Sequence, residues 1–441
     1  MKKLFLFTLI FGAFACSETD NSMVVPQQET TQSAPLTRLR SEREAIVAAI
    51  KTADKLYPKV SSRSARTIAS IKAITSISSR SGDIDTLIYV VNFEDNGGYA
   101  LISAPRAADE VLAVVGVGAY DPEEGSDNPG LNFFLDAAND YVSTLAWTGD
   151  IGGDTIPRLP TEDDMHDAFL VKRDTIAEYG GRHHIPDDFG WGQGGIYGAY
   201  CSNKLAGCGP VAIATIMAYI NSFFYPTTEM QYTFTGRDLD SEVIDWPQIY
   251  KHRRIGHTIK EWNSKIGDSV LVYYPSICHE SSQYNVHKTI GRIMRQIGQI
   301  AGSNYDPKKG TGTDARKVPD ALKRLLPTPI TVGSLKNFNS VKVMQSIDRG
   351  LLYMSGATSN NEGHAWVADG YYYIKTNITT ATWDFDKKQW YGYKTETRER
   401  SLTYFHWGWH GHDDGYYANN VFETSAGTFD RRIKYIDVLF R

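Results

Sequence analysis

Features that would assign this chain to a specialised class are scarce in its sequence. Cysteine occurs four times in 441 residues, so each thiol needs its own explanation. The formal net charge of −5 gives no electrostatic basis for binding nucleic acid. There is no internal repeat, and no run beyond the N-terminus is apolar enough to span a membrane. What remains is a globular composition, 41% hydrophobic and 22% charged, in a chain long enough for two domains.

The first 38 residues have the pattern of an export signal followed by a tether. Lys2 and Lys3 precede an apolar run, 4–14, that is too short to cross a bilayer. Cys16 follows a small residue, which resembles a bacterial lipoprotein signal with residues 1–15 as signal peptide; ordinary secretion is the alternative. Residues 16–38 are rich in Ser, Thr, Gln and Pro and indicate a flexible tether. We expect an outer membrane lipoprotein, on the periplasmic or cell-surface face, that contacts the membrane only through lipid on Cys16.

Cys208 stands at the start of an apolar helical pattern, 206–220. Gly209 and Pro210 follow it, and proline is favoured in the first turn of a helix. A thiol at a helix N-terminus has a lowered pKa and is a reactive nucleophile, whereas a packed structural cysteine is the alternative. If Cys16 carries lipid, three cysteines remain, so at least one is unpaired, and Cys208 is the candidate. Whether Cys201 pairs with Cys278 stays open.

The pattern after the tether predicts a small α+β domain over residues 39–150. A capped helix is expected over Ser41–Tyr57, and β-rich runs 86–93 and 99–103 flank Asn96-Gly97 as a hairpin. A further strand near 110–120 and an amphipathic helix over 130–147 complete it. A linker, 151–172, rich in Asp, Gly and Pro, follows, and the dibasic pair Lys172-Arg173 is a candidate processing site.

Residues 173–441 predict a second domain with helices first and strands later. Besides the Cys208 helix, helices are expected near 286–300 and 317–326. Strand-like runs follow at 350–357, 364–373, 402–409 and 433–440. This order favours the α+β class with an antiparallel sheet.

A cysteine nucleophile needs a base and an oxyanion donor, and two residues are placed for these roles. His364 begins an apolar strand pattern just after Gly363, and Gln193 lies in a glycine-rich segment fifteen residues before Cys208. Each alone is weak evidence, since a strand-end histidine is more often structural. Together, their order resembles that of the streptopain family of papain-like cysteine peptidases. The matching positions are Trp191-Gly192-Gln193, Cys208 with Ala212, Ala214, Ile216, Met217 and Tyr219, Gly363-His364-Ala365, Asp369-Gly370, Trp407-Gly408-Trp409 and Asp414-Gly415-Tyr416-Tyr417.

The resemblance, which covers about 173–441, implies a papain-like fold and a peptidase that cleaves protein or peptide substrates without a cofactor. Cys208 would be the nucleophile, His364 the acid–base residue and Gln193 the oxyanion donor. Trp407 would form one side of the site and shield the thiolate–imidazolium pair from water. Gly363 and Thr311 would contact substrate, Thr311 because its tract resembles the loop that borders the family's cleft. The 39–150 domain resembles the family's inhibitory propeptide, so the chain would be a zymogen inhibited by its own N-terminal domain.

His406 departs from the family pattern, which has Asn before Trp-Gly-Trp. We expect neutral His406 to accept a hydrogen bond from the N–H of the His364 ring, with repulsion lowering one or both pKa values once both rings are charged. The alternative is that His406 points away and Trp407 alone supports His364. His406, His410 and His412 lie near Asp413 and Asp414, but their spacing lacks a helix-borne ligand pair, and we expect no metal. The alternative to a peptidase is an inactive papain-like lipoprotein that binds peptide or glycan.

Overall fold

The computed structural model describes residues 39–58, 66–77, 84–146, 169–185, 190–223, 246, 249, 257–263, 268–274, 281–357, 363–384, 386–423 and 432–440. The predicted signal, Cys16, the tether, Cys278 and positions 151–168 of the linker lie outside these residues. No helix in the described part is long and apolar enough to cross a membrane. Residues Thr37–Arg441 form one compact unit.

The N-terminal elements agree with the predicted α+β pattern. They are α1 (Glu42–Leu56), β1 (Ile68–Ile77), β2 (Ile84–Phe93), β3 (Tyr99–Ser103), β4 (Val111–Val115) and α2 (Pro129–Ala146). Helix α1 begins at a capping box, in which the Ser41 hydroxyl accepts from Glu44 N–H and the Glu44 carboxylate accepts from Ser41 N–H. Strands β2 and β3 form the predicted hairpin, and positive φ angles at Asp95 (57°) and Asn96 (56°) turn the chain between them.

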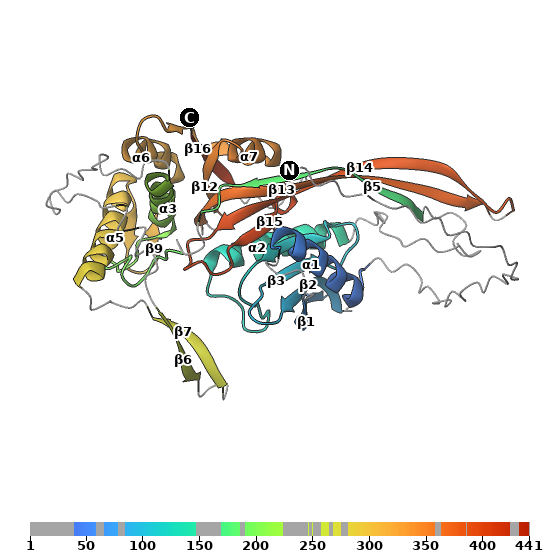
Figure 1. The fold of residues 1–441 in the computed structure, drawn as a ribbon, viewed down its shortest axis with the longest axis horizontal. Helices are drawn as coiled ribbons and strands as arrows, with labels where there is room; N and C mark the ends of the chain where they lie inside the picture. The colour runs from blue at the N-terminus through green and yellow to red at the C-terminus, as the bar shows by residue number, and fades with distance from the viewer. Residues whose placement is uncertain are drawn as a thin grey trace, which may run out of the picture. The chain divides into compact units, whose positions relative to one another are not determined.

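In the C-terminal part, the three predicted helices precede the four predicted strands. The elements are β5 (Phe169–Arg182), α3 (Cys208–Phe223), β6 (His257–Asn263), β7 (Asp268–Tyr274), α5 (Ser281–Ile300), β8 (Asn304–Asp306), β9 (Gly310–Gly312), the 3₁₀ helix η3 (Ala315–Lys317), α6 (Val318–Leu325), β10 (Thr331–Val332), β11 (Lys336–Asn337), α7 (Ser340–Ile347), β12 (Gly350–Ala357), β13 (Gly363–Asp384), β14 (Gln389–His406), β15 (Gly415–Ala418), η4 (Asn419–Phe422) and β16 (Lys434–Leu439). The strands β5 to β11 were not predicted. The long strands β13 and β14 can be followed in Figure 1.

One antiparallel sheet runs through both predicted domains. Its strand order is β1-β2-β3-β4-β15-β14-β13-β12-β16-β10, with β11 on β16 and β5 on β13, twelve strands in all. The junction is the pair β4–β15, in which Ala113 faces Tyr417 and Val115 faces Gly415. The α+β class is therefore confirmed, and the two predicted domains share a sheet.

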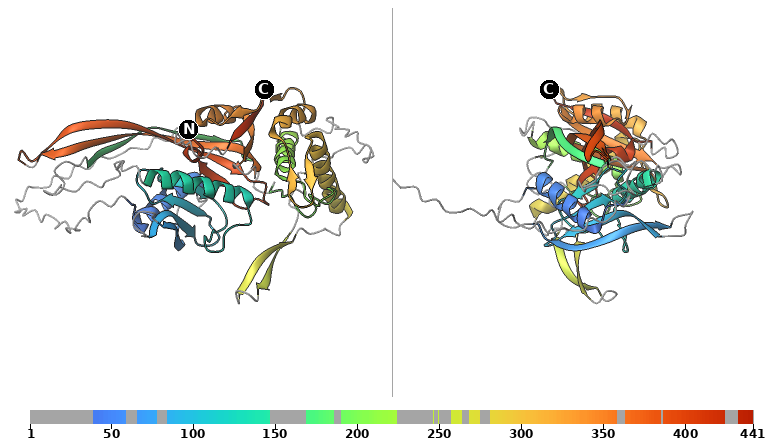
Figure 2. Two further views of the ribbon diagram at one scale, coloured as in Figure 1. Left: turned by 180° about the vertical axis from the view of Figure 1, so that it is seen from behind. Right: turned by 90° about the vertical axis from the view of Figure 1, so that its right-hand side faces the viewer.

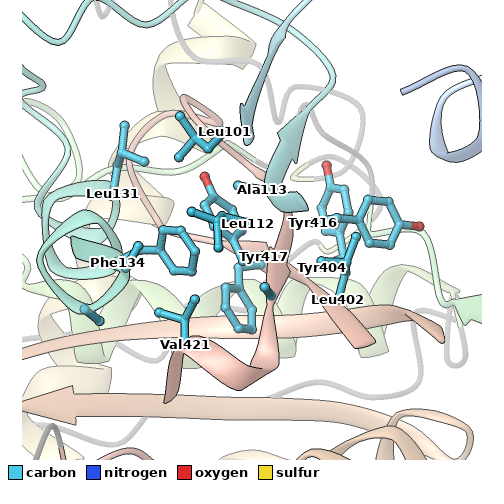
Figure 3. Packing of buried hydrophobic residues seen from close by; sticks show 14 of the residues in the cluster. Leu101, Leu112, Ala113, Leu131, Phe134, Leu402, Tyr404, Tyr416, Tyr417 and Val421 are labelled. Atoms are coloured by element: carbon cyan, nitrogen blue, oxygen red, sulfur yellow. The ribbon is translucent and has the colours of Figure 1, made fainter. Parts of the chain in front are cut away.

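Two hydrophobic cores lie against β12 and β13. Ala365 and Val367 belong to the core around α3, whereas Trp366 and Ala368 belong to a core that also contains residues of α2. Neighbouring residues enter different cores because side chains alternate across a strand. Figure 2 shows the teal helix α2 along the blue N-terminal strands, and this helix contacts β2, β13 and η4. Figure 3 shows the shared core, where N-terminal Leu101, Leu112, Ala113, Leu131 and Phe134 pack with Leu402, Tyr404, Tyr416, Tyr417 and Val421.

The predicted linker ends earlier than residue 172. Strand β5 begins at Phe169, and within it Lys172 pairs with Thr379 and Arg173 with Ile378 of β13. The dibasic pair is therefore part of the sheet rather than of a loop. A protease that cuts there must first separate β5 from β13, because cleavage requires an extended, unpaired chain.

Candidate active site

Cys208 is the first residue of α3, and a packed loop leads into it. Gly207 has φ +90°, and a Cβ there would lie 2.7 Å from Thr311 Cγ2, so only glycine fits. The Thr311 hydroxyl donates to Leu205 O at 2.7 Å and accepts from Asn203 Nδ2 at 2.9 Å. Thr311 thus fixes the segment of the chain that leads into Cys208. Its contact with substrate stays a prediction.

The Cys208 thiol is partly buried, and its pKa is higher than expected. Burial raises the pKa above its ordinary value, and hydrogen bonds from the backbone of Ala365 and Gly209 offset this only in part. The predicted lowering by the helix N-terminus is therefore wrong for this state of the chain, because desolvation outweighs it. Cys208 is a neutral free thiol at neutral pH.

Gln193 is held near Cys208 through the backbone. Its carbonyl accepts from Ala206 N–H at 2.8 Å, two residues before the thiol, and its side chain is partly exposed. The adjoining Trp191 carbonyl accepts from His410 N–H at 3.2 Å, and a Cβ on Gly192 would lie 2.3 Å from the His410 ring. The Trp-Gly-Gln segment is thus fixed beside the loop that enters α3, and its oxyanion role stays a prediction.

His364 is buried on β13, opposite Gly356 of β12, with 5% of its surface exposed. Its Nε2 lies 2.8 Å from the Trp407 carbonyl oxygen. A carbonyl only accepts, so Nε2 carries the proton and Nδ1 keeps the lone pair of a base. The rings of Trp366 and Trp407 lie 6.2 and 6.0 Å away. Burial lowers the pKa of His364 to about 4, although the bond to Trp407 opposes the shift.

His406 does not make its predicted contact with His364. The Trp407 carbonyl takes that place, and the His406 ring instead faces Asp414 at 3.0 Å and Asp369 at 3.2 Å. The expectation that His406 is neutral is also wrong, since these carboxylates raise its pKa to about 9 against the effect of burial. Asp369 and Asp414 were both among the positions that match the family pattern. The sequence alone assigns no role to either, because it does not show which side chain each carboxylate faces.

No hydrogen bond joins Cys208 and His364 in the part of the chain that the structure describes. Gly363 is exposed and pairs with Ala357 beside His364, which leaves its backbone next to the site; contact with substrate stays a prediction. Over the described ranges, no group of three His, Cys, Asp or Glu side chains is arranged to hold a metal ion.

Helix α2 of the N-terminal part covers the aromatic side of His364. A Cβ on Gly130 would lie 2.4 Å from Trp407 Cε3, so the helix backbone lies directly on that indole. The Phe133 ring lies 5.9 Å from Trp366 and packs on Gly356, the strand partner of His364. The burial of His364 is thus connected to the presence of α2.

The N-terminal part also binds the loop between β14 and β15. The Tyr99 hydroxyl donates to Asp413 Oδ1 at 2.8 Å, and Asn128 Nδ2 donates to Asp413 Oδ2 at 3.1 Å and to His412 O at 2.9 Å. Three donated hydrogen bonds and the β4–β15 pairing therefore hold α2 in place.

The chain is similar to a fragment of prointerpain A from Prevotella intermedia, with 15% identity, a TM-score of 0.44, and coverage of 83% of this chain and 97% of that one. No curated protein matches. The model of the Peptidase C10 family matches residues 191–417, which include Gln193, Cys208, His364 and Trp407. This chain belongs to the Peptidase C10 family and is a cysteine peptidase.

Proposed function

We propose that the chain is the zymogen of an exported, lipid-anchored cysteine endopeptidase that acts through Cys208 and His364. The observation that carries the proposal is the hydrogen bond from His364 Nε2–H to the Trp407 carbonyl. It leaves Nδ1 as the basic nitrogen, which is the state a general base needs. The position of the Cys208 thiol at the start of α3, beside the Ala365 backbone of the same strand, supports the pairing.

In the proposed reaction, His364 Nδ1 takes the proton from Cys208, and the thiolate attacks the scissile carbonyl carbon. The Gln193 side chain and the Cys208 N–H stabilise the oxyanion. His364 then gives its proton to the leaving amine, which departs and leaves a thioester on Cys208. Water, deprotonated by His364, attacks the thioester, and the acid product leaves as the thiol is restored.

The zymogen state follows from the two pKa shifts. At neutral pH, a histidine with a pKa near 4 and a thiol with a raised pKa are both uncharged. Removal of α2 uncovers the side of His364 that carries Trp366 and Trp407, and hydration there raises the pKa of His364. A charged His364 beside Cys208 in turn lowers the pKa of the thiol. The thiolate–imidazolium pair then becomes accessible near neutrality. Residues 39–150 thus inhibit the enzyme by burying its base.

Activation requires a cut between α2 and β5. Because Lys172 and Arg173 are paired with β13, we expect the cut within 151–168 rather than at the dibasic pair. Mass spectrometry of the processed enzyme measures its first residue. A mature form that begins at Asp174 would contradict this part of the proposal.

The test of the catalytic role uses the purified chain from residue 17 with an unfolded protein, and maps every cleavage by mass spectrometry. Cys208→Ala should reduce hydrolysis by at least about 10³-fold, since no other group replaces the nucleophile. The matched control is Cys201→Ala, which removes the other described free thiol, buried near Tyr305. Equal activity of the Cys208→Ala and wild-type chains would overturn the proposal.

The lipid anchor is tested separately. The wild-type chain should be recovered with membranes and incorporate labelled fatty acid, and Cys16→Ala should do neither. A wild-type chain that is released without label would support ordinary secretion instead.

A further inference from the structure

Four charged side chains from different elements meet next to the Trp407 peptide. Arg182 ends β5, Asp369 lies on β13, His406 ends β14, and Asp414 precedes β15. His406 Nδ1 lies 3.0 Å from Asp414 Oδ2, and His406 Nε2 lies 3.2 Å from Asp369 Oδ2. Arg182 Nε lies 3.2 Å from Asp369 Oδ1. None of the four side chains is more than 11% exposed; together they are called the His406 cluster.

The carboxylates around His406 favour a charged ring. A neutral imidazole has one N–H, so its other nitrogen is an acceptor. Nδ1 of His406 forms a hydrogen bond with Asp414, whereas Nε2 lies at ion-pair distance from Asp369 without hydrogen-bond geometry. Both nitrogens thus face carboxylate oxygens, which are acceptors, and this favours the imidazolium, which carries an N–H on each side. The charges then balance, with Arg182 and His406 opposite Asp369 and Asp414, as buried charges must. Burial by itself lowers the pKa of His406, but Asp369 and Asp414 outweigh it and raise the pKa to about 9.

Among the other groups near the cluster, Asp413 faces Asp414; burial raises the pKa of Asp413, and Tyr99 and Asn128 donate hydrogen bonds to its carboxylate. The Tyr404 ring lies 5.1 Å from the His406 ring, and Ile185 N–H donates to Asp369 Oδ2 at 2.7 Å. Tyr219 of α3 also faces Asp369, but burial and then Asp369 raise the pKa of its hydroxyl to about 12, so it stays neutral.

Trp407 joins the cluster to the catalytic base. Asp414 Oδ1 accepts from Trp407 N–H at 2.9 Å, and the Trp407 carbonyl accepts from His364 Nε2–H at 2.8 Å. The orientation of the Trp407 backbone therefore depends on a carboxylate whose second oxygen is bound by His406. We propose that His406, as an imidazolium, is a positioning residue for His364 that acts through Asp414 and Trp407. The proposal rests on the proposed function, because it concerns the base of that reaction.

Loss of the charge on His406 has a defined consequence. The ring would keep one donor, so one carboxylate would face a lone pair, and the cluster would carry an excess negative charge. Asp414 would then move, and with it the Trp407 carbonyl that orients His364. A misplacement of about 1 Å in catalytic geometry costs on the order of 10²-fold in rate. The substrate contacts would remain, so kcat should fall while KM changes little.

The kinetic test uses His406→Asn in the processed enzyme. We expect kcat to fall about 10²-fold with KM within about twofold of wild type. Adding Asp369→Asn to this variant removes one carboxylate charge, restores the balance, and should recover kcat by about tenfold. The matched control is His184→Asn, at an exposed histidine with φ +57°, a conformation that asparagine tolerates. A purely structural role would lower the yield of folded protein without this charge-dependent recovery.

A second measurement does not need activity. In the full chain carrying Cys208→Ala and ¹⁵N-labelled histidine, one ring should show two protonated nitrogens at pH 7, and His406→Asn should remove that signal. A neutral His406 ring at pH 7, or an unchanged kcat in His406→Asn, would overturn the proposal. Failure of the proposed function would look different, because the wild-type enzyme would hydrolyse nothing while the ring spectrum stayed that of an imidazolium.

Discussion

His364 and His406 lie on the neighbouring strands β13 and β14, and the Trp407 peptide connects them. His364 is surrounded by Trp366, Trp407 and helix α2, and burial among these groups lowers its pKa to about 4. His406 is equally buried, but two carboxylates outweigh its desolvation and raise its pKa to about 9. The difference shows that burial alone does not decide the charge of a histidine. Opposite charges within hydrogen-bonding distance do.

The two regions also differ in what holds them. The side of His364 that carries Trp366 and Trp407 is covered by the N-terminal helix α2, and under the proposed function processing removes this cover. The His406 cluster contains only residues after position 169, so the proposed cut within 151–168 would leave all its partners in place. Under the proposed function, His364 changes its charge on activation and His406 keeps its own.

The largest expected effect comes from Asp414, the residue that joins the two regions. Asp414→Ala removes the partner of His406 and the acceptor of Trp407 N–H, and it leaves a buried charge uncompensated. We expect a loss of about 3–5 kcal/mol in the free energy of unfolding, measured by urea denaturation of the Cys208→Ala chain. Asp414→Asn keeps the oxygen that faces Trp407 and should lose less. Equal losses in both variants would show that the two oxygens have no separate roles.

The pH dependence of stability should separate the two histidines. His406 has a raised folded pKa, so its stabilising effect is complete below about pH 6.5 and is lost as the pH rises through 9. His364 has a depressed folded pKa, so its neutral ring stabilises the fold above about pH 6.5, and this is lost as the pH falls through 4. On each side of the stability–pH curve, the change in the free energy of unfolding should be about 3 kcal/mol.

Unfolding of the Cys208→Ala chain at pH 5, 7 and 9 measures both limbs. His406→Asn should flatten only the alkaline side, and His364→Asn only the acid side. A variant that flattens both sides would contradict the separate assignment.

The smallest expected effect is on inhibition by the N-terminal part, residues 39–150, whose helix α2 covers one side of His364. Residues 39–150 have a core of their own between α1 and β2–β4, so this part should fold alone and inhibit the processed enzyme in trans. Tyr99→Phe removes a hydrogen bond to the Asp413 carboxylate and should raise the inhibition constant about tenfold. Tyr120→Phe is the control, because its ring packs 5.8 Å from Tyr99 without that bond. An intact domain that fails to inhibit would contradict its role as a cover.

Local signals in the sequence predicted much of the fold. The Ser41–Glu44 capping box, the turn at Asn96 and the apolar period of α3 each act over a few residues, and the structure contains all three elements. The pairing of Lys172 and Arg173 with β13 was missed, because their partners lie some 200 positions later in the chain. The shared sheet was missed for the same reason, since β4 and β15 are brought together only by the tertiary fold.

By itself, the sequence determined the family, the α+β class and the candidates Gln193, Cys208, His364 and Trp407, since residue types at fixed spacings are enough for these. Tertiary structure decided the charges. It placed α2 on the pocket of His364, raised the pKa of Cys208 by burial, and put His406 between Asp369 and Asp414. A pKa depends on how much water surrounds a group and on which charges lie within a few ångströms, and distances across strands set both.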